Sequence, residues 1–241
     1  MRLDKAVALS GISRRDAKNA LSAGRVCVNG QPVRNAGLIL KEGDTVTLDG
    51  RELRAETTLH LMLNKPAGCI TATEDAHGEK TVLDLIPPAL RLKGLGPVGR
   101  LDKDVTGLVF LTTDGQLAHR LISPKRGVEK QYTALVEGTP DEECVKRFAE
   151  GIRLKDFEAL PARLEIAEKG SESSLCRVFV SEGKYHQVKR MLGAVGHPVL
   201  RLRRDSIAGV KLDTSLAEGE FRRLTPQEIA ALYKAAGMEE A

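Results

Sequence analysis

The chain has 241 residues, of which 41% are hydrophobic and 3% aromatic, and its formal net charge is +4. This length suits one medium domain plus a small one, and the hydrophobic content is sufficient for a packed core. No run reaches the roughly 18 apolar residues that cross a membrane, and the charges within residues 1–5 interrupt the apolar segment of a secretory signal. We therefore expect a cytoplasmic protein that does not enter a membrane.

The cysteine spacing argues against a metal or disulfide framework. Structural zinc sites and small disulfide-bonded domains use closely spaced cysteines. The chain has four, far apart and without a C-x-x-C pair: Cys27, Cys69, Cys144 and Cys176. We expect buried, reduced thiols and no structural metal site.

Basic residues concentrate in two stretches. Residues 1–54 hold ten Lys and Arg against six Asp and Glu, whereas the remainder of the chain is neutral. Within that remainder, residues 184–211 hold seven basic residues against the single Asp205. Two basic surfaces on a nearly balanced chain favour a polyanion held at two places, although ordinary solubilising charge explains the same counts.

Two helices are predicted at the start of the chain. Residues 2–9 place apolar side chains between charged ones, which is typical of a short amphipathic helix. Ser13 is positioned to cap a second helix that ends near Gly24, with Asp16 at the capping-box position.

Short strands and a linker follow these helices. Asn29 and Gly30 form a tight-turn signal between two short apolar segments, and residues 45–48 alternate as a further strand. Residues 51–58 have no apolar periodicity and indicate a linker.

A buried strand is predicted over residues 59–64 and stops at the Pro and Gly of residues 65–68. The β-branched run at residues 69–73 predicts that the strand resumes, and the polar residues 74–80 predict a loop.

The stretch from Gly99 to Gly107 is a charged loop that enters the apolar run at residues 108–113. Loops fixed by a rigid strand often carry catalytic side chains. The plainer interpretation makes Arg100, Asp102 and Asp104 solvated turn residues.

Residues 102–106 also fit D-x-D-x-T, the nucleophile motif of magnesium-dependent phosphotransferases. That motif directly follows a buried strand, whereas residues 93–99 are too rich in Gly and Pro to form one. The context argues against this alternative.

The remaining pattern alternates helices and strands. Asp114 caps a predicted helix that reaches residue 122, and Thr225 begins a capping box with Pro at the first helical position of a last helix. Further elements are a strand at 129–136, a helix at 141–150, strands at 159–168 and 174–182, and a strand end leading into a helix at 182–192. We expect an α+β fold, with a mixed, mainly antiparallel sheet and flanking helices.

The N-terminal pattern resembles the S-four type RNA-binding domain. Two basic helices precede G-R-V-x-V-N-G at residues 24–30 and x-G-D-x-V at residues 42–46. The resemblance implies domains at about 1–54 and 59–241, joined by a linker at about 51–58. It also implies RNA backbone contacts, which position a protein without choosing a base; a small charged domain without a ligand is the alternative. The implied contacts are Arg14, Arg15, Lys18 and Arg25.

Four motifs, in order, resemble the RsuA/RluA pseudouridine synthases across nearly the whole chain. They are N-K-P-x-G at 64–68, G-R-L-D at 99–102 followed by T-G-L at 106–108, K-x-Y at 130–132, and E-G-K-Y-H-Q-V-K-R-M at 182–191. The last is closest to the RsuA branch. The resemblance implies an isomerase that converts a uridine of ribosomal RNA to pseudouridine, without cofactor or metal.

The same resemblance implies the roles of the site residues. Asp102 attacks the sugar or base, or removes a sugar proton, and the sequence does not choose between these. Lys189 is the cation that offsets the cost of burying that charge. Tyr132 lies beside the target base, and Arg100 fills the space vacated by the flipped nucleotide or holds it.

Other residues of the motifs have weaker assignments. Lys184 and Arg190 are expected RNA contacts, and Asp104 has no implied role. His186 and Gln187 are structural or RNA-facing rather than catalytic, with a general base as the alternative role of His186. The sequence of the last motif favours 16S ribosomal RNA as substrate, either free or in an assembling small subunit. We expect a monomeric enzyme. A 23S enzyme and a non-catalytic ribosomal RNA-binding assembly factor are the alternatives.

Overall fold

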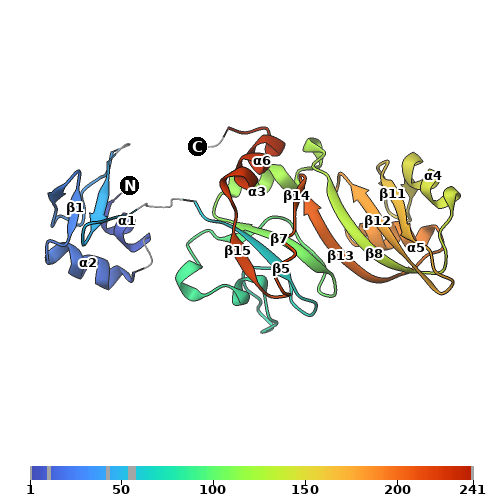
Figure 1. Cartoon of the computed structure of the whole chain (residues 1–241), viewed down its shortest axis with the longest axis horizontal. Helices are drawn as coiled ribbons and strands as arrows, with labels where there is room; N and C mark the ends of the chain where they lie inside the picture. Colours follow the sequence, from blue (N-terminus) through green and yellow to red (C-terminus); the bar gives the residue numbers. More distant parts are fainter. Residues whose placement is uncertain (1, 10–11, 42–43, 54–57, 240–241) are drawn as a thin grey trace. The chain divides into compact units, whose positions relative to one another are not determined.

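The structure, a computed structural model, describes residues 2–9, 12–41, 44–53 and 58–239. Contacts divide the chain into two compact units (Figure 1). One comprises Met1–Leu59 with Pro87–Lys93, and the other comprises His60–Ile86 with Gly94–Ala241.

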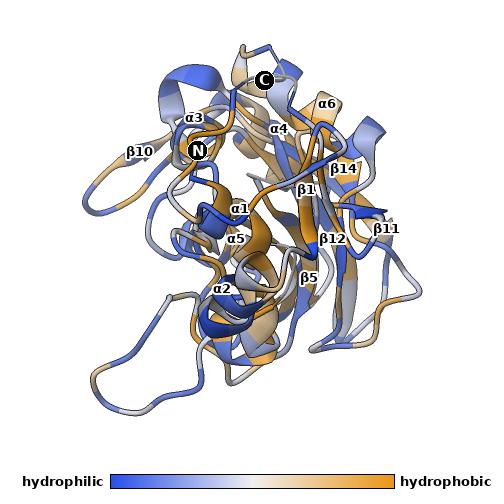
Figure 2. Ribbon diagram, turned by 90° about the vertical axis from the view of Figure 1, so that its left-hand side faces the viewer, coloured by the Kyte–Doolittle hydropathy of each residue, from blue (hydrophilic) through white to orange (hydrophobic). Residues whose placement is uncertain are grey.

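The first unit begins with α1 (Leu3–Leu9) and α2 (Arg14–Ser22). The Ser13 hydroxyl accepts a hydrogen bond from the Asp16 backbone N–H at 3.1 Å, as the cap predicted. The outward positions of α2 are hydrophilic (Figure 2). Inward-facing side chains of both helices pack with the strands in a small core that includes Leu3, Val7, Ala17, Leu21, Val26 and Val46.

The sheet of this unit has the strand order β2-β1-β3-β4. Its strands are β1 (Val26–Val28), β2 (Gln31–Pro32), β3 (Val46–Leu48) and β4 (Arg51–Glu52). Strand β4 lies where the sequence predicted a linker. It forms because Asp49 and Gly50, with φ of 52° and 76°, turn the chain back onto β3. Residues 54–57 of the expected linker lie outside the described residues.

The second unit is built on a sheet whose main path is β11-β12-β8-β13-β7-β5-β15. Its pairings are antiparallel except for the parallel pair β13–β7, which confirms the predicted mixed, mainly antiparallel α+β fold. The strands are β5 (His60–Lys65), β6 (Gly96–Pro97), β7 (Thr106–Thr112), β8 (Lys130–Glu137), β11 (Arg163–Glu168), β12 (Ser173–Val180), β13 (Val199–Ile207), β14 (Val210–Lys211) and β15 (Phe221–Arg223). A separate hairpin pairs β9 (Ile152–Arg153) with β10 (Glu158–Ala159).

Four α-helices pack on this sheet. They are α3 (Gly115–Ile122), α4 (Glu142–Glu150), α5 (Gln187–Ala194) and α6 (Pro226–Ala236). The second unit also has 3-10 turns at Val82–Leu85 and Pro124–Arg126, and a further 3-10 turn, Pro88–Leu90, belongs to the first unit. Helices α3 and α6 lie together beside β15, β5 and β7 (Figure 1), where Met62, Leu108 and Phe110 join them in one core. Helix α4 packs against β11, and α5 packs against β13. In the described part of the chain, no helix is long and apolar enough to cross a membrane.

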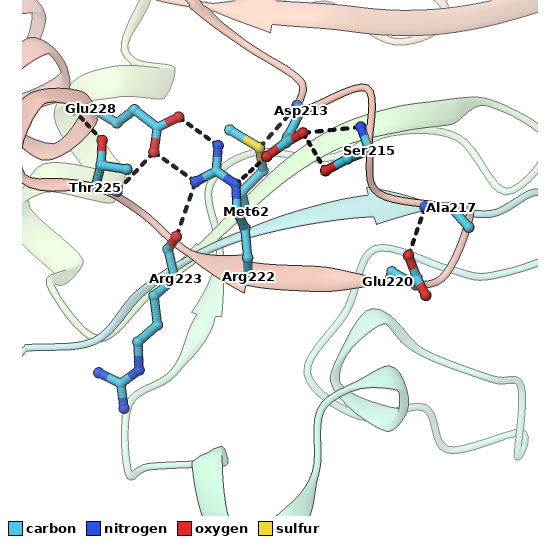
Figure 3. Close-up of polar contacts among 9 residues, drawn as sticks. All are labelled: Met62, Asp213, Ser215, Ala217, Glu220, Arg222, Arg223, Thr225 and Glu228. Carbon is cyan, nitrogen blue, oxygen red and sulfur yellow. Dashed lines mark hydrogen bonds and ion pairs between the residues drawn. The ribbon is translucent and has the colours of Figure 1, made fainter.

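Arg222 joins the end of the chain to the sheet (Figure 3). From β15, its guanidinium donates to the Asp213 carboxylate at 2.6 Å and to both Glu228 carboxylate oxygens at 2.7 and 2.8 Å. Glu228 is also the acidic member of the Thr225 capping box. One guanidinium therefore fixes β15, the start of α6 and the loop that carries Asp213.

Candidate active site

The charged loop Leu101–Val105 is placed by the strand that follows it. Strand β7 begins at Thr106, and Gly107 has a φ of 101°. A Cβ at Gly107 would lie 2.3 Å from the Arg204 carbonyl oxygen of β13. Glycine is therefore required where the two parallel strands meet, directly after the loop.

Side chains of segment 65–71 form hydrogen bonds with the backbone of the same loop. Lys65 is fully buried, and its ammonium donates to the carbonyl oxygens of Lys103 at 3.2 Å and Val105 at 2.8 Å. Burial lowers the pKa of Lys65 below its ordinary value. Thr71 Oγ1 donates to the Leu101 carbonyl at 2.8 Å and accepts from the Leu101 N–H at 3.1 Å.

These bonds explain a difference from the predicted elements. The strand expected to resume at residues 69–73 does not form, and only an isolated bridge joins Ile70 to Thr81. Within this segment the Thr71 hydroxyl bonds to the Leu101 backbone, whereas the Ile70 N–H donates to the Lys80 carbonyl and the Ile70 carbonyl accepts from the Val82 N–H.

The loop opens onto a small pocket of about 70 Å³. Among its lining residues are Arg100, Asp102, Tyr132, Lys184 and Lys189, so five of the predicted site residues converge. They come from the loop before β7, from β8, and from the turn and first helical residues at α5.

Lys189 is shared between two carboxylates. Its Nζ lies 3.2 Å from Asp102 Oδ2 and donates to the two Asp104 carboxylate oxygens at 2.7 and 2.9 Å. Burial alone lowers the pKa of Lys189, but the hydrogen bonds to Asp104 and Asp102 outweigh it and raise that pKa. The hydrogen bond from Lys189 lowers the pKa of Asp104. Asp102 is 30% exposed and Asp104 74% exposed.

Tyr132 and Arg100 occupy different depths of the pocket. Tyr132 is 8% exposed and sits on β8, directly opposite Val178 and Arg204 in the neighbouring strands. Strand neighbours alternate faces, and the residues on either side of Tyr132 line a different hollow of 720 Å³. Arg100 is exposed at the rim.

His186 contacts Asp102, a contact that the sequence reasoning missed. His186 Nε2 lies 3.5 Å from Asp102 Oδ2, and its backbone has a φ of 50° immediately before α5. The available signal was that His186 stands in the same E-G-K-Y-H-Q-V-K-R-M stretch as Lys189, three residues before it.

Lys184 and Arg190 are held by the hairpin β9–β10. Arg190 forms an ion pair with Asp156, and Lys184 Nζ donates to the Glu158 carbonyl at 3.3 Å. Both cations also lie over the ring of Phe157, with the charged centres 4.3 Å (Lys184) and 4.8 Å (Arg190) from its centroid.

Lys130 is buried on the same strand as Tyr132. It is 7% exposed, and its ammonium donates to the Val128 carbonyl at 2.8 Å. Burial and, to a smaller extent, nearby Arg204 lower the pKa of Lys130 to about 8, and Glu182 opposes the shift. The K-x-Y motif therefore includes a lysine that is easily neutralised.

The predicted RNA-contacting residues of the first unit have different surroundings. Arg15 and Lys18 line a hollow of 640 Å³ together with Arg2, Asp4 and Lys5. Arg25 is paired with Asp49 through its guanidinium. Arg14 begins α2, and its side chain lies outside the described part of the chain. Over the described residues, no cluster of three or more His, Cys, Asp or Glu side chains could hold a metal ion.

Comparison with known proteins covers both units. A family model described as RNA pseudouridylate synthase matches residues 59–194, and an S4 domain model matches residues 1–46. The chain is 41% identical over 236 residues to the ribosomal small subunit pseudouridine synthase A of Escherichia coli, covering 96% of this chain and 100% of that protein. It is 36% identical over 237 residues to the ribosomal large subunit pseudouridine synthase B of Bacillus subtilis, covering 96% and 95%. A crystal structure of a pseudouridylate synthase superimposes with a TM-score of 0.66 at 38% identity, covering 96% of this chain and 99% of that one.

Proposed function

Because the chain belongs to the RNA pseudouridylate synthase family and carries an S4 domain, we propose that it converts one uridine of 16S ribosomal RNA to pseudouridine with Asp102 as its catalytic carboxylate. Family membership makes it an isomerase that acts on RNA. The observation that supports the catalytic assignment is the convergence of Asp102, Lys189 and Tyr132 on one pocket.

The reaction exchanges one bond for another within the nucleotide. The bond from the ribose C1′ to N1 of uracil breaks, the base rotates, and C1′ joins C5; the proton lost from C5 is matched by one gained at N1. Asp102 serves either as the nucleophile that attacks sugar or base, or as the base that removes a sugar proton. No electrons and no phosphoryl group are transferred, so the chemistry itself demands neither metal nor cofactor.

The carboxylate must stay ionised next to a base that excludes water. Desolvation disfavours the charged form, and a cation at ion-pair distance offsets that cost. Lys189 Nζ lies 3.2 Å from Asp102 Oδ2. We assign Lys189 this electrostatic role.

A uridine inside a helix cannot reach the pocket, so the nucleotide must be flipped out. Tyr132, on the pocket wall, supplies the flat face for the uracil ring. Arg100 at the rim supports the displaced strand or the flipped nucleotide.

RNA backbone contacts come from both units. In the S4 unit, at about residues 1–54, Arg15 and Lys18 border the basic hollow, and we add Arg14 and Arg25. In the synthase unit, at about residues 59–241, Lys184 lines the pocket and Arg190 lies one residue past Lys189. We propose that the enzyme acts as a monomer in the cytoplasm.

The choice of 16S over 23S RNA rests on two observations. The sequence motif at residues 182–191, E-G-K-Y-H-Q-V-K-R-M, resembles that of the small-subunit branch. The identity to the E. coli small subunit enzyme is 41%. The 36% identity to the B. subtilis large subunit enzyme supports 23S RNA as the second candidate.

The proposal is tested by incubating the purified protein with transcribed 16S and 23S RNA, separately, and mapping pseudouridine chemically. We expect one new pseudouridine in 16S RNA and none in 23S RNA. Modification of 23S RNA alone would overturn the target assignment. Absence of pseudouridine in both, with and without small-subunit proteins bound, would favour a non-catalytic assembly factor.

A further inference from the structure

Tyr185 exposes most of its ring in a chain with few aromatic residues. The sequence contains three tyrosines and five phenylalanines. Tyr132 and Tyr233 are only 8% and 4% exposed, whereas Tyr185 is 69% exposed. Core packing does not explain such a ring, because it buries little area. An exposed tyrosine offers a flat apolar face with a polar tip, which suits a binding surface.

The ring is connected to the pocket through its neighbour. It stacks on the imidazole of His186, with centroids 3.8 Å apart and an interplanar angle of 17°. His186 Nε2 in turn lies 3.5 Å from Asp102 Oδ2. Two stacked rings therefore extend outward from the edge of the Asp102 pocket, and a base placed on the outer face of Tyr185 continues that stack.

The turn that carries both rings is held by buried hydrogen bonds. Gln187 Nε2 donates to Glu182 Oε1 at 2.7 Å, and the Lys184 N–H donates to Gln187 Oε1 at 3.0 Å. Glu182 and Gln187 are each only 4% exposed. The turn that presents the two rings is thus held in place before any ligand arrives, which lowers the cost of ordering that backbone on binding.

Two cations belong to the same stretch of chain as Tyr185. Lys184 precedes it, and Arg190 Nη1 donates to the Tyr185 carbonyl at 3.5 Å. A flat aromatic face beside Lys and Arg is the combination that binds a base together with its backbone phosphate in unpaired RNA.

We infer that the outer face of Tyr185 is the stacking platform for the base of a nucleotide adjacent to the target uridine. The inference rests on the proposed function, because it requires an RNA strand whose target uridine lies at Asp102. Flipping the target removes one stacking partner from each neighbouring base. Tyr185 replaces that partner.

Two substitutions of Tyr185 distinguish the effect of its flat ring from the effect of its apolar volume. Tyr185→Leu keeps an apolar side chain without a flat face, and Tyr185→Phe keeps the ring. In single-turnover pseudouridine formation on transcribed ribosomal RNA, we expect Tyr185→Leu to raise the half-saturating enzyme concentration about tenfold. Tyr185→Phe stays within about twofold of wild type, and the rate at saturation is unchanged for both. Leu200→Ala is the matched control, because Leu200 is also exposed, at 50%.

A direct readout uses synthetic RNA hairpins that contain the mapped target, with 2-aminopurine on its 5′ or its 3′ side. Wild type and Tyr185→Phe should quench the fluorescence on one side, and Tyr185→Leu should not. Equal quenching by wild type and Tyr185→Leu at both positions, or equal half-saturation, would overturn the platform alone. A wild-type protein that forms no pseudouridine overturns the proposed function, and the platform with it.

Discussion

At the residue scale, one ammonium group serves two carboxylates with different exposure. Asp104 is largely solvated, and water weakens an exposed pair. Asp102 is more buried and lies farther from Lys189 Nζ, at 3.2 Å against 2.7 Å for Asp104. We propose that the charge of Asp102 depends on this cation, because Asp102 has less water around it than Asp104.

Replacing that cation should separate catalysis from binding. Lys189→Met keeps the length of the side chain and removes its charge, so we expect turnover to fall by about a hundredfold or more while RNA affinity stays within about threefold. Lys103→Met is the control, because Lys103 lies in the loop that carries Asp102 but pairs with Glu79. Single-turnover rates and filter binding measure the two quantities, and a wild-type rate for Lys189→Met would refute the assigned role.

The buried Lys130 should make the free energy of unfolding depend on pH. Its pKa is about 8 in the folded protein, against 10.5 ordinarily. Between these values the unfolded chain binds more protons than the folded one, so the contribution of Lys130 to stability rises with pH. Relative to Lys130→Met, wild type should gain about 2 kcal/mol in its free energy of unfolding from pH 7.5 to pH 10. Urea denaturation at both values checks this, and a constant difference between the two proteins would contradict it.

At the element scale, Gly107 is the point where the loop, β7 and β13 meet. A methyl group there clashes with the Arg204 backbone and a φ of 101° strains any other residue. We expect Gly107→Ala to lower the free energy of unfolding by about 3 kcal/mol. Gly115→Ala is the matched control, because a Cβ there meets nothing within 4 Å at the start of α3. Equal stability of the two variants in thermal and urea unfolding would show that the contact is not formed.

Many helices and strands could be predicted from the sequence, because a local signal such as a capping residue decides where they begin. The caps at Ser13, Asp114 and Thr225 lie where the capping residues indicated, and each begins the helix predicted there. The strand predicted at 129–136 corresponds to β8.

The elements that were not predicted depend on distant partners. Residues 69–73 have strand-like composition, but the Thr71 hydroxyl bonds to the Leu101 backbone, thirty residues away. The β9–β10 hairpin has strands of two residues, too short for a period to show. The Lys189–Asp104 contact joins residues 85 positions apart, and no local pattern encodes it.

At the scale of the whole molecule, the fold offers basic side chains in two units. In the first, Arg15 and Lys18 border the basic hollow; in the second, the cations lie beside the Asp102 pocket. Phosphate contacts release counterions from the RNA, and this makes binding weaken with salt in proportion to their number.

Removing two of these charges should therefore change the salt dependence. For Arg15→Ala with Lys18→Ala, we expect weaker binding to every RNA and a slope of log affinity against log salt that is smaller by about 1.5. The control is Lys146→Ala with Arg153→Ala, two exposed cations of the second unit. Fluorescence anisotropy over a salt series measures the slope, and equal slopes for the two double variants would exclude the basic hollow from RNA binding.

The central claim is that one ionised carboxylate, at Asp102, performs the isomerisation. The most direct measurement compares wild type with Asp102→Asn on the same transcribed ribosomal RNA, at saturating enzyme, by quantifying pseudouridine after digestion. We expect no pseudouridine above the level without enzyme, while RNA affinity and unfolding temperature match wild type. Accumulation of pseudouridine by Asp102→Asn at the wild-type rate would contradict the claim.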